Sequence, residues 1–174
     1  MDIKSKKGFT LIEMLIVIST LTFLITVLVL YNRTGERQII LLREKAKLIN
    51  VILRTKSLAL NTFVEKEPAC GYGIAFEERE YFIYKDLSSN CRNSDHIFSG
   101  SSLGEKIESE SNVLDPALKF YRLDVRDIFF APPDPQVYLD GGQSLDEAEI
   151  GLSTNDENSK ANILINNAGQ ISSQ

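Results

Sequence analysis

A single carboxylate lies inside the longest apolar stretch of the chain. Glu13 is the only charged residue between Lys7 and Arg33. A carboxylate at membrane depth is costly to desolvate, so it is a candidate for pairing with a cation and for a functional role. A second interpretation is that Glu13 lies within about one turn of the interface and reaches the lipid head groups. The residues alone leave both interpretations open.

The other residues with reactive side chains are few. Cys70 and Cys91 are the only cysteines, and they have no C-x-x-C spacing that would indicate a redox or zinc role. We predict that they form a disulfide, which in the chain-entropy model stabilises by about 3 kcal/mol; two independent thiols are the alternative. His96, the only histidine, lies in a polar stretch, and we expect an exposed surface residue there. We therefore predict no catalytic residue.

The apolar stretch determines the topology. Residues 9–31 are long enough, at about 1.5 Å per residue, to cross a hydrocarbon core of about 30 Å as a helix. Lys4, Lys6 and Lys7 directly precede it, which places the N-terminus in the cytoplasm. The rest of the chain then lies on the oxidising side of the membrane, where disulfides persist.

Residues 6–13, KKGFTLIE, resemble the cleavage and methylation motif of type IV prepilins and type II secretion pseudopilins. The resemblance implies that a prepilin peptidase cuts between Gly8 and Phe9 on the cytoplasmic side and methylates the new amine of Phe9. An ordinary secretory signal is cut after its apolar stretch at a small-x-small site, and residues 31–34, YNRT, offer none. We therefore expect the helix to stay attached to the mature protein.

The same resemblance implies a structural subunit, a minor pilin or pseudopilin, in the inner membrane and then in a type IV pilus or type II secretion pseudopilus. The implied partners are prepilin peptidase, other pilin or pseudopilin subunits, the inner-membrane assembly platform and lipid. In the fibre, Glu13 is implied to meet the Phe9 amine of a neighbouring subunit. The alternative is a fibre-tip subunit that recognises DNA, secreted cargo or a surface.

Charge divides the rest of the chain. Residues 33–66 hold eight basic and three acidic side chains, a net charge of +5. Residues 67–174 hold eight basic and nineteen acidic ones, a net charge of −11. The acid excess argues against nucleic acid as a partner, because phosphate binding requires clustered Lys and Arg. The basic segment either lies near anionic lipid or is the solvated face of an amphipathic helix, and we favour the second interpretation.

We expect the helix to continue beyond the membrane. Apolar residues with 3-4 spacing predict one stripe covered by the following domain: Ile39, Leu42, Ala46, Ile49 and Leu53, with Leu60 and Phe63 further along. Pro68 marks the end of the helix. The expected segments are a leader at 1–8, a transmembrane helix and fibre core at 9–31, an amphipathic continuation at 32–66 and a β-rich head at 67–174.

The sequence predicts that the head forms an antiparallel sheet packed against the long helix, which is an α+β fold. The sequence predicts a hairpin with a turn near residues 77–79, a polar loop over 88–112, and later strands at residues 118–125, 127–131, 136–139, 148–153, 161–166 and 170–171. The ending at residues 163–171 also resembles the closing hairpin of H-type, FimT-like minor pseudopilins.

We predict no cofactor and no metal. Calcium is the alternative that we considered, because acidic residues gather late in the chain: Asp134, Asp140, Asp146, Glu147, Glu149 and Asp156. Calcium requires six to eight oxygens held by a tight loop, and no EF-hand spacing is present. Acidic loops are usually solvated surface.

Overall fold

The computed structural model describes residues 9–62, 69–88, 90–100, 105–132 and 136–173. It divides into two compact units, Met1–Gln38 and Ile39–Gln174. The long helix α1, Leu11–Asn61, contributes residues to both units, and antiparallel sheets follow it. The predicted α+β fold is thereby confirmed. The segment boundaries at residues 31 and 66 remain predictions.

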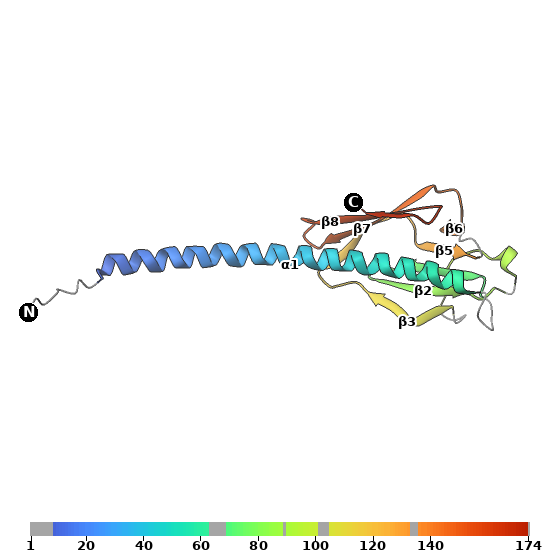
Figure 1. The fold of residues 1–174 in the computed structure, drawn as a ribbon, viewed down its shortest axis with the longest axis horizontal. Helices are drawn as coiled ribbons and strands as arrows, with labels where there is room; N and C mark the ends of the chain where they lie inside the picture. Colours follow the sequence, from blue (N-terminus) through green and yellow to red (C-terminus); the bar gives the residue numbers. More distant parts are fainter. Residues whose placement is uncertain (1–8, 63–68, 89, 101–104, 133–135, 174) are drawn as a thin grey trace, which may run out of the picture. The chain divides into compact units, whose positions relative to one another are not determined.

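Two antiparallel sheets form the head (Figure 1). One has the strand order β3-β2-β1-β5-β6 and the other has the order β4-β7-β8-β9. The strands are β1 Gly71–Phe76, β2 Glu80–Asp86, β3 Lys106–Val113, β4 Leu118–Leu123, β5 Asp127–Ala131, β6 Gln136–Leu139, β7 Glu147–Thr154, β8 Lys160–Asn166 and β9 Ile171–Ser173. A short 3-10 helix, η2 Cys91–Asn93, follows β2.

The predicted hairpin at the start of the head is present. β1 and β2 pair in register from Gly71–Asp86 to Phe76–Tyr81, and the turn lies between Phe76 and Glu80. All six residues of β1 are buried, because both faces of this part of the sheet are covered. A Cβ atom on Gly73 would collide with the ring of Tyr84, so only glycine fits beneath that ring.

One face of α1 packs into the main core, but it is not the face that the sequence predicted. Leu41, Leu48, Ile52 and Ala59 are buried against strands of both sheets. The predicted stripe is largely exposed: Ile39 is 67%, Leu42 61%, Leu53 49% and Leu60 46% exposed. Phe63 lies outside the described residues.

Polar residues on the buried face explain the wrong prediction. Glu44 and Thr55 are buried there, which broke the apolar pattern when the sequence was read alone. The Tyr81 hydroxyl donates to the Glu44 carboxylate over 3.0 Å, and the Thr55 hydroxyl donates to the Val51 carbonyl over 2.8 Å. Because buried polar groups are tolerated when they are hydrogen-bonded, both residues can face the core.

The opposite face of the five-stranded sheet carries a second, smaller aromatic cluster. Phe82, Tyr84 and Phe129 are fully buried there, and Phe98 of the loop after β2 packs on them. The sequence predicted a loop from residue 88 to 112, and this was wrong at its end, where β3 begins at Lys106. β3 pairs only with β2 at the sheet edge, where alternating charged residues are common and conceal the strand pattern.

The buried face of α1 generates the first testable prediction. Ile52 is 0% exposed and its neighbour Leu53 is 49% exposed. Ile52→Ala should lower the free energy of unfolding by about 2–5 kcal/mol, because it leaves a cavity in the core. The matched variant Leu53→Ala should change it by less than about 0.5 kcal/mol. Denaturant unfolding of dilute full-length protein in detergent measures both, and equal losses would contradict the assignment of faces.

Candidate functional site

The N-terminal end of α1 is closed by reciprocal hydrogen bonds between Thr10 and Glu13. The Glu13 amide donates to the Thr10 hydroxyl over 3.3 Å, and the Glu13 carboxylate accepts from the Thr10 amide over 2.8 Å. The Thr10 hydroxyl also donates to that carboxylate over 2.9 Å. The Thr10 carbonyl accepts the first helical bond, from Met14, so Thr10 is the N-cap. Together these bonds form a capping box.

The capping box adds a third interpretation of Glu13. Thr-x-x-Glu before an apolar run is a readable signature of a helix start, and our reading of the sequence missed it. A carboxylate in the first turn is also favoured by the helix dipole. Glu13 is therefore tied to its own helix end in the single chain, whatever it contacts in an assembly.

The remaining residues of the motif flank this cap. Phe9 is 82% exposed and precedes the helix together with Thr10. Gly8, Lys4, Lys6 and Lys7 lie outside the described residues, so the predicted cleavage site and topology signal remain predictions. Phe9 is in the described part, and its backbone is not helical.

The segment after the cap is suited to an apolar environment. Leu11–Val29 has a mean hydropathy of 2.5 and is long and apolar enough to cross a membrane. The hydroxyls of three threonines within it donate to carbonyls one turn back: Thr20 to Val17, Thr22 to Ile18 and Thr26 to Thr22. These bonds satisfy polar groups within the helix itself, as a lipid environment requires.

A second region of chemical interest is the loop between β2 and β3. A disulfide joins Cys70, directly before β1, to Cys91 in η2, with 5.1 Å between the Cα atoms. The Asn90 side chain accepts from the Arg92 amide over 3.1 Å and caps η2. The pairing expected from the sequence is therefore present in the structure, and it fixes the loop beside the aromatic cluster.

His96 lies in this loop and is not the exposed residue that the sequence predicted. Its ring is half-buried, 4.9 Å from the Phe129 ring centroid and 4.1 Å from that of Tyr138. Nδ1 is buried and has no hydrogen-bond partner among the described residues. Burial lowers the pKa of His96, although Asp86 and Asp95 act in the opposite direction. The ring packs against these two aromatic rings.

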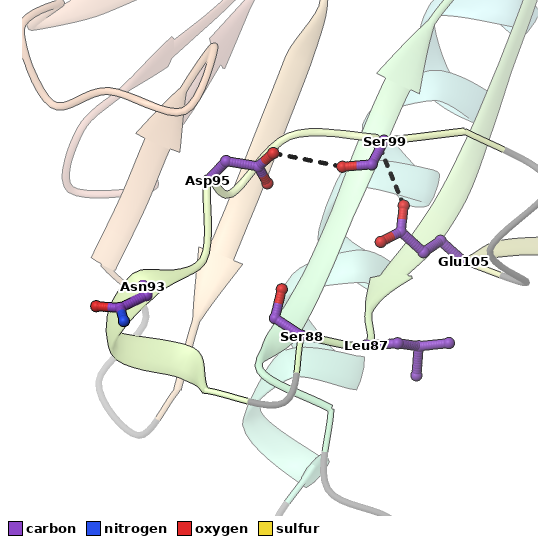
Figure 2. Close-up of a pocket in the computed structure, with 6 residues that line it drawn as sticks. All are labelled: Leu87, Ser88, Asn93, Asp95, Ser99 and Glu105. Atoms are coloured by element: carbon purple, nitrogen blue, oxygen red, sulfur yellow. Dashed lines mark hydrogen bonds between the residues drawn. The ribbon is translucent and has the colours of Figure 1, made fainter.

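Carboxylates within the loop and beside it make hydrogen bonds to loop residues. Burial raises the pKa of Asp127 to about 6, although the Phe98 amide donates to it over 3.1 Å. Burial also raises the pKa of Glu105, whose side chain accepts from the Ser99 amide over 3.0 Å. Figure 2 shows Asp95 and Glu105 both hydrogen-bonded to Ser99 beside a pocket of about 350 Å³.

These carboxylates hold the loop in place. Asp127 lies on β5, so its hydrogen bond from the Phe98 amide attaches the loop to a strand. Asp95 and Glu105 belong to the loop, and their hydrogen bonds with Ser99 hold the loop to itself. Within the described residues, no group of three or more histidine, cysteine or carboxylate side chains is placed to hold a metal ion. Asp134, one of the acidic residues considered for calcium, lies outside the described residues, and the others are not gathered into such a group in the part that the structure describes.

Comparison with known proteins identifies the N-terminal segment. Residues 3–29 match the family model of the prokaryotic N-terminal methylation motif. The match includes the capping box and most of the apolar helix, and it ends before the head begins. No curated protein and no solved structure matches the chain.

Asp127 generates a prediction on pH dependence. Its pKa of about 6 lies above the unfolded value of about 3.9, so the stability that its proton provides below about pH 4 is lost as the pH rises through 6. Asp127→Asn keeps an acceptor for the Phe98 amide and removes the charge. After allowance for solvent screening, the variant should be about 1–2 kcal/mol more stable than the wild type at pH 7.5, and nearly equal to it at pH 4.

Denaturant unfolding of the full chain in detergent at both pH values measures this difference. Glu78→Gln, on an exposed side chain in the β1–β2 turn, is the control for a general effect of removing one negative charge. A stability difference for Asp127→Asn that does not change with pH would contradict the prediction.

Proposed function

We propose that this chain, which carries the N-terminal methylation motif of the type IV pilin and pseudopilin superfamily, is a structural subunit of a pilus or secretion pseudopilus. The carrying observation is the match over residues 3–29 together with an apolar helix that is long enough to span a membrane. The subunit is held in the inner membrane with its head outside, and it is then assembled with other subunits. The motif family is structural rather than enzymatic.

Processing by prepilin peptidase is the first step of this proposal. The peptidase cuts between Gly8 and Phe9 and then methylates the amine of Phe9. Phe9 and Thr10 lie outside α1, and Phe9 is 82% exposed, which supports access to this bond without unwinding the helix. Residues 1–8 are removed as a leader, and the helix remains with the head.

Assembly through Glu13 is the second step. In the single chain, Thr10 donates two hydrogen bonds to the Glu13 carboxylate. In the fibre, the amine of Phe9 from a neighbouring subunit provides a cation for the same carboxylate. An ion pair in a low dielectric is costly to desolvate, so we expect it to add little net stability. Its main contribution is to fix the axial position of one subunit relative to its neighbour. Only a subunit at the right height neutralises both charges.

The position of the subunit within the fibre is the finer part of the proposal. The β8–β9 hairpin lies where the sequence resembles the closing hairpin of H-type minor pseudopilins, which supports a minor subunit. The inner-membrane assembly platform and lipid are its further partners. The net charge of −11 over residues 67–174 gives no support to a tip subunit that binds DNA.

Processing can be tested at Gly8. The peptidase must accommodate the residue before its cut in a narrow site, so a branched side chain there should block cleavage. Gly8→Val should leave the full-length precursor in the membrane when it is co-expressed with a prepilin peptidase, whereas the wild type loses residues 1–8. Intact mass measurement separates the two forms. Normal removal of the leader from the variant would count against the proposed processing.

Assembly can be tested at Glu13 with two variants that separate charge from capping. Glu13→Gln keeps an acceptor for the Thr10 amide, since glutamine also completes a capping box, and removes only the charge. Glu13→Leu removes both. We expect each variant to be cut after Gly8 and to insert in the membrane, and each to enter fibres several-fold less than the wild type.

The measurement is the ratio of sheared-fibre to membrane-bound protein in the native host. If Glu13→Gln assembles normally and Glu13→Leu does not, the side chain at position 13 acts as a helix cap and its charge is not required. If both assemble normally, Glu13 has no role in assembly.

A further inference from the structure

The pocket in the loop between β2 and β3 has the size of a small-ligand site. The described residues that line it all belong to this loop, and its volume is about 350 Å³. Small-ligand pockets in proteins usually have volumes of about 300–1,000 Å³. The lining residues are Leu87, Ser88, Asn93, Asp95, Ser99 and Glu105.

Glu105 presents an unpaired oxygen to this pocket. The residue is only 6% exposed, and its carboxylate oxygen Oε2 accepts from the Ser99 amide over 3.0 Å. The other oxygen, Oε1, has no hydrogen-bond partner among the described residues. Figure 2 shows the carboxylate directed toward the space between Ser88 and Asp95. A buried acceptor without a donor costs free energy, so this oxygen is ready to accept from a group outside the chain.

Negative charge around Glu105 is not balanced by a cation in the described part of the chain. Burial raises the pKa of Glu105, and the nearby carboxylates Asp86 and Asp95 raise it further. The described group that lowers this pKa is the Ser99 amide, which carries no charge. A cation bound in the pocket would therefore offset the repulsion among three carboxylates.

The lining residues suit an alkylammonium group better than a metal ion. Within the described residues, no three histidine, cysteine or carboxylate side chains are placed to hold a metal. An ammonium group has three donors and no acceptor. The pocket offers it Glu105 Oε1, the Asp95 carboxylate and the Ser88 hydroxyl as acceptors. Leu87, which is 44% exposed, provides an apolar surface for the methylene chain that carries the ammonium group.

We propose that this pocket binds a primary alkylammonium group, held by the carboxylates of Glu105 and Asp95. Ser88 and Asn93 are exposed, so the group enters from the surface of the head. Two sources present the same chemistry: the side chain of a lysine on another protein, and a free alkyl diamine. The inference is independent of the proposed function, because it depends only on the residues of the loop.

The test is titration calorimetry of the full chain in detergent. The salt concentration is about 150 mM, which screens general attraction to the acidic head. The ligands are N-acetyl-lysine N-methylamide, 1,5-diaminopentane and N-acetyl-norleucine N-methylamide, which lacks only the ammonium group of the lysine derivative. We expect at least one ammonium ligand to bind about tenfold or more tightly than the norleucine derivative, because it adds charge-assisted hydrogen bonds. Tighter binding of the lysine derivative identifies a protein as the source, and tighter binding of the diamine identifies a free amine.

Three variants locate the bound group. Glu105→Gln keeps an acceptor for the Ser99 amide and removes the charge, so it should weaken binding by about tenfold or more. Asn93→Leu places a larger apolar side chain at an exposed residue of the lining, and it should weaken binding several-fold by obstruction. Glu78→Gln removes an exposed carboxylate at the other end of β2 and should change the affinity by less than about twofold. Denaturant unfolding checks that each variant is folded, and Asn93→Leu keeps the test available if Glu105→Gln is not.

Three results would overturn the inference. The first is equal affinity for the lysine and norleucine derivatives. The second is a loss of affinity in Glu78→Gln as large as that in Glu105→Gln, which would indicate general attraction to the head. The third is displacement of the ammonium ligands by calcium ions at equal concentration, which would assign the pocket to a metal ion. None of these results bears on leader removal or entry into fibres, so the proposed function is tested separately.

Discussion

The head depends on the burial of one face of α1 against two sheets that share no strand pairing. Residues of the helix, such as Leu48 and Ile52, lie in a single core cluster with Ile74 of one sheet and Ile163 of the other. Without the helix, each sheet would expose an apolar face. The buried hydrogen bond from Tyr81 to Glu44 also fixes the rotation of the helix about its axis, because only one orientation brings the two side chains together.

Local patterns in the sequence predicted well those elements that local interactions decide. The β1–β2 hairpin follows from two short apolar strands around Glu77–Arg79, and the N-terminal motif can be read from residues 6–13 alone. The disulfide followed from there being only two cysteines outside a membrane. The hairpin and the motif depend on residues that are neighbours in sequence, and the disulfide depends on the number of cysteines.

The features that were missed depend on partners distant in sequence. The predicted stripe on α1 looked like the core face because it is purely apolar, whereas the true core face includes Glu44 and Thr55, whose partners cannot be seen from spacing. β3 was missed because an edge strand with one solvated face need not be apolar. His96 looked exposed because the stacking of its ring on Phe129 and Tyr138 is a tertiary contact.

The position of the helix cap has a consequence for maturation. Thr10 and Glu13 both lie on the retained side of a cut before Phe9, and neither needs a leader residue for its hydrogen bonds. The precursor and the mature chain would therefore share one helix start. Cleavage would convert the peptide nitrogen of Phe9 from a neutral amide into a positively charged ammonium group. The backbone conformation of the helix start would not change. The precursor in the membrane would then already have the helix start of the assembled subunit. The charge at the N-terminus would be the difference between the two forms.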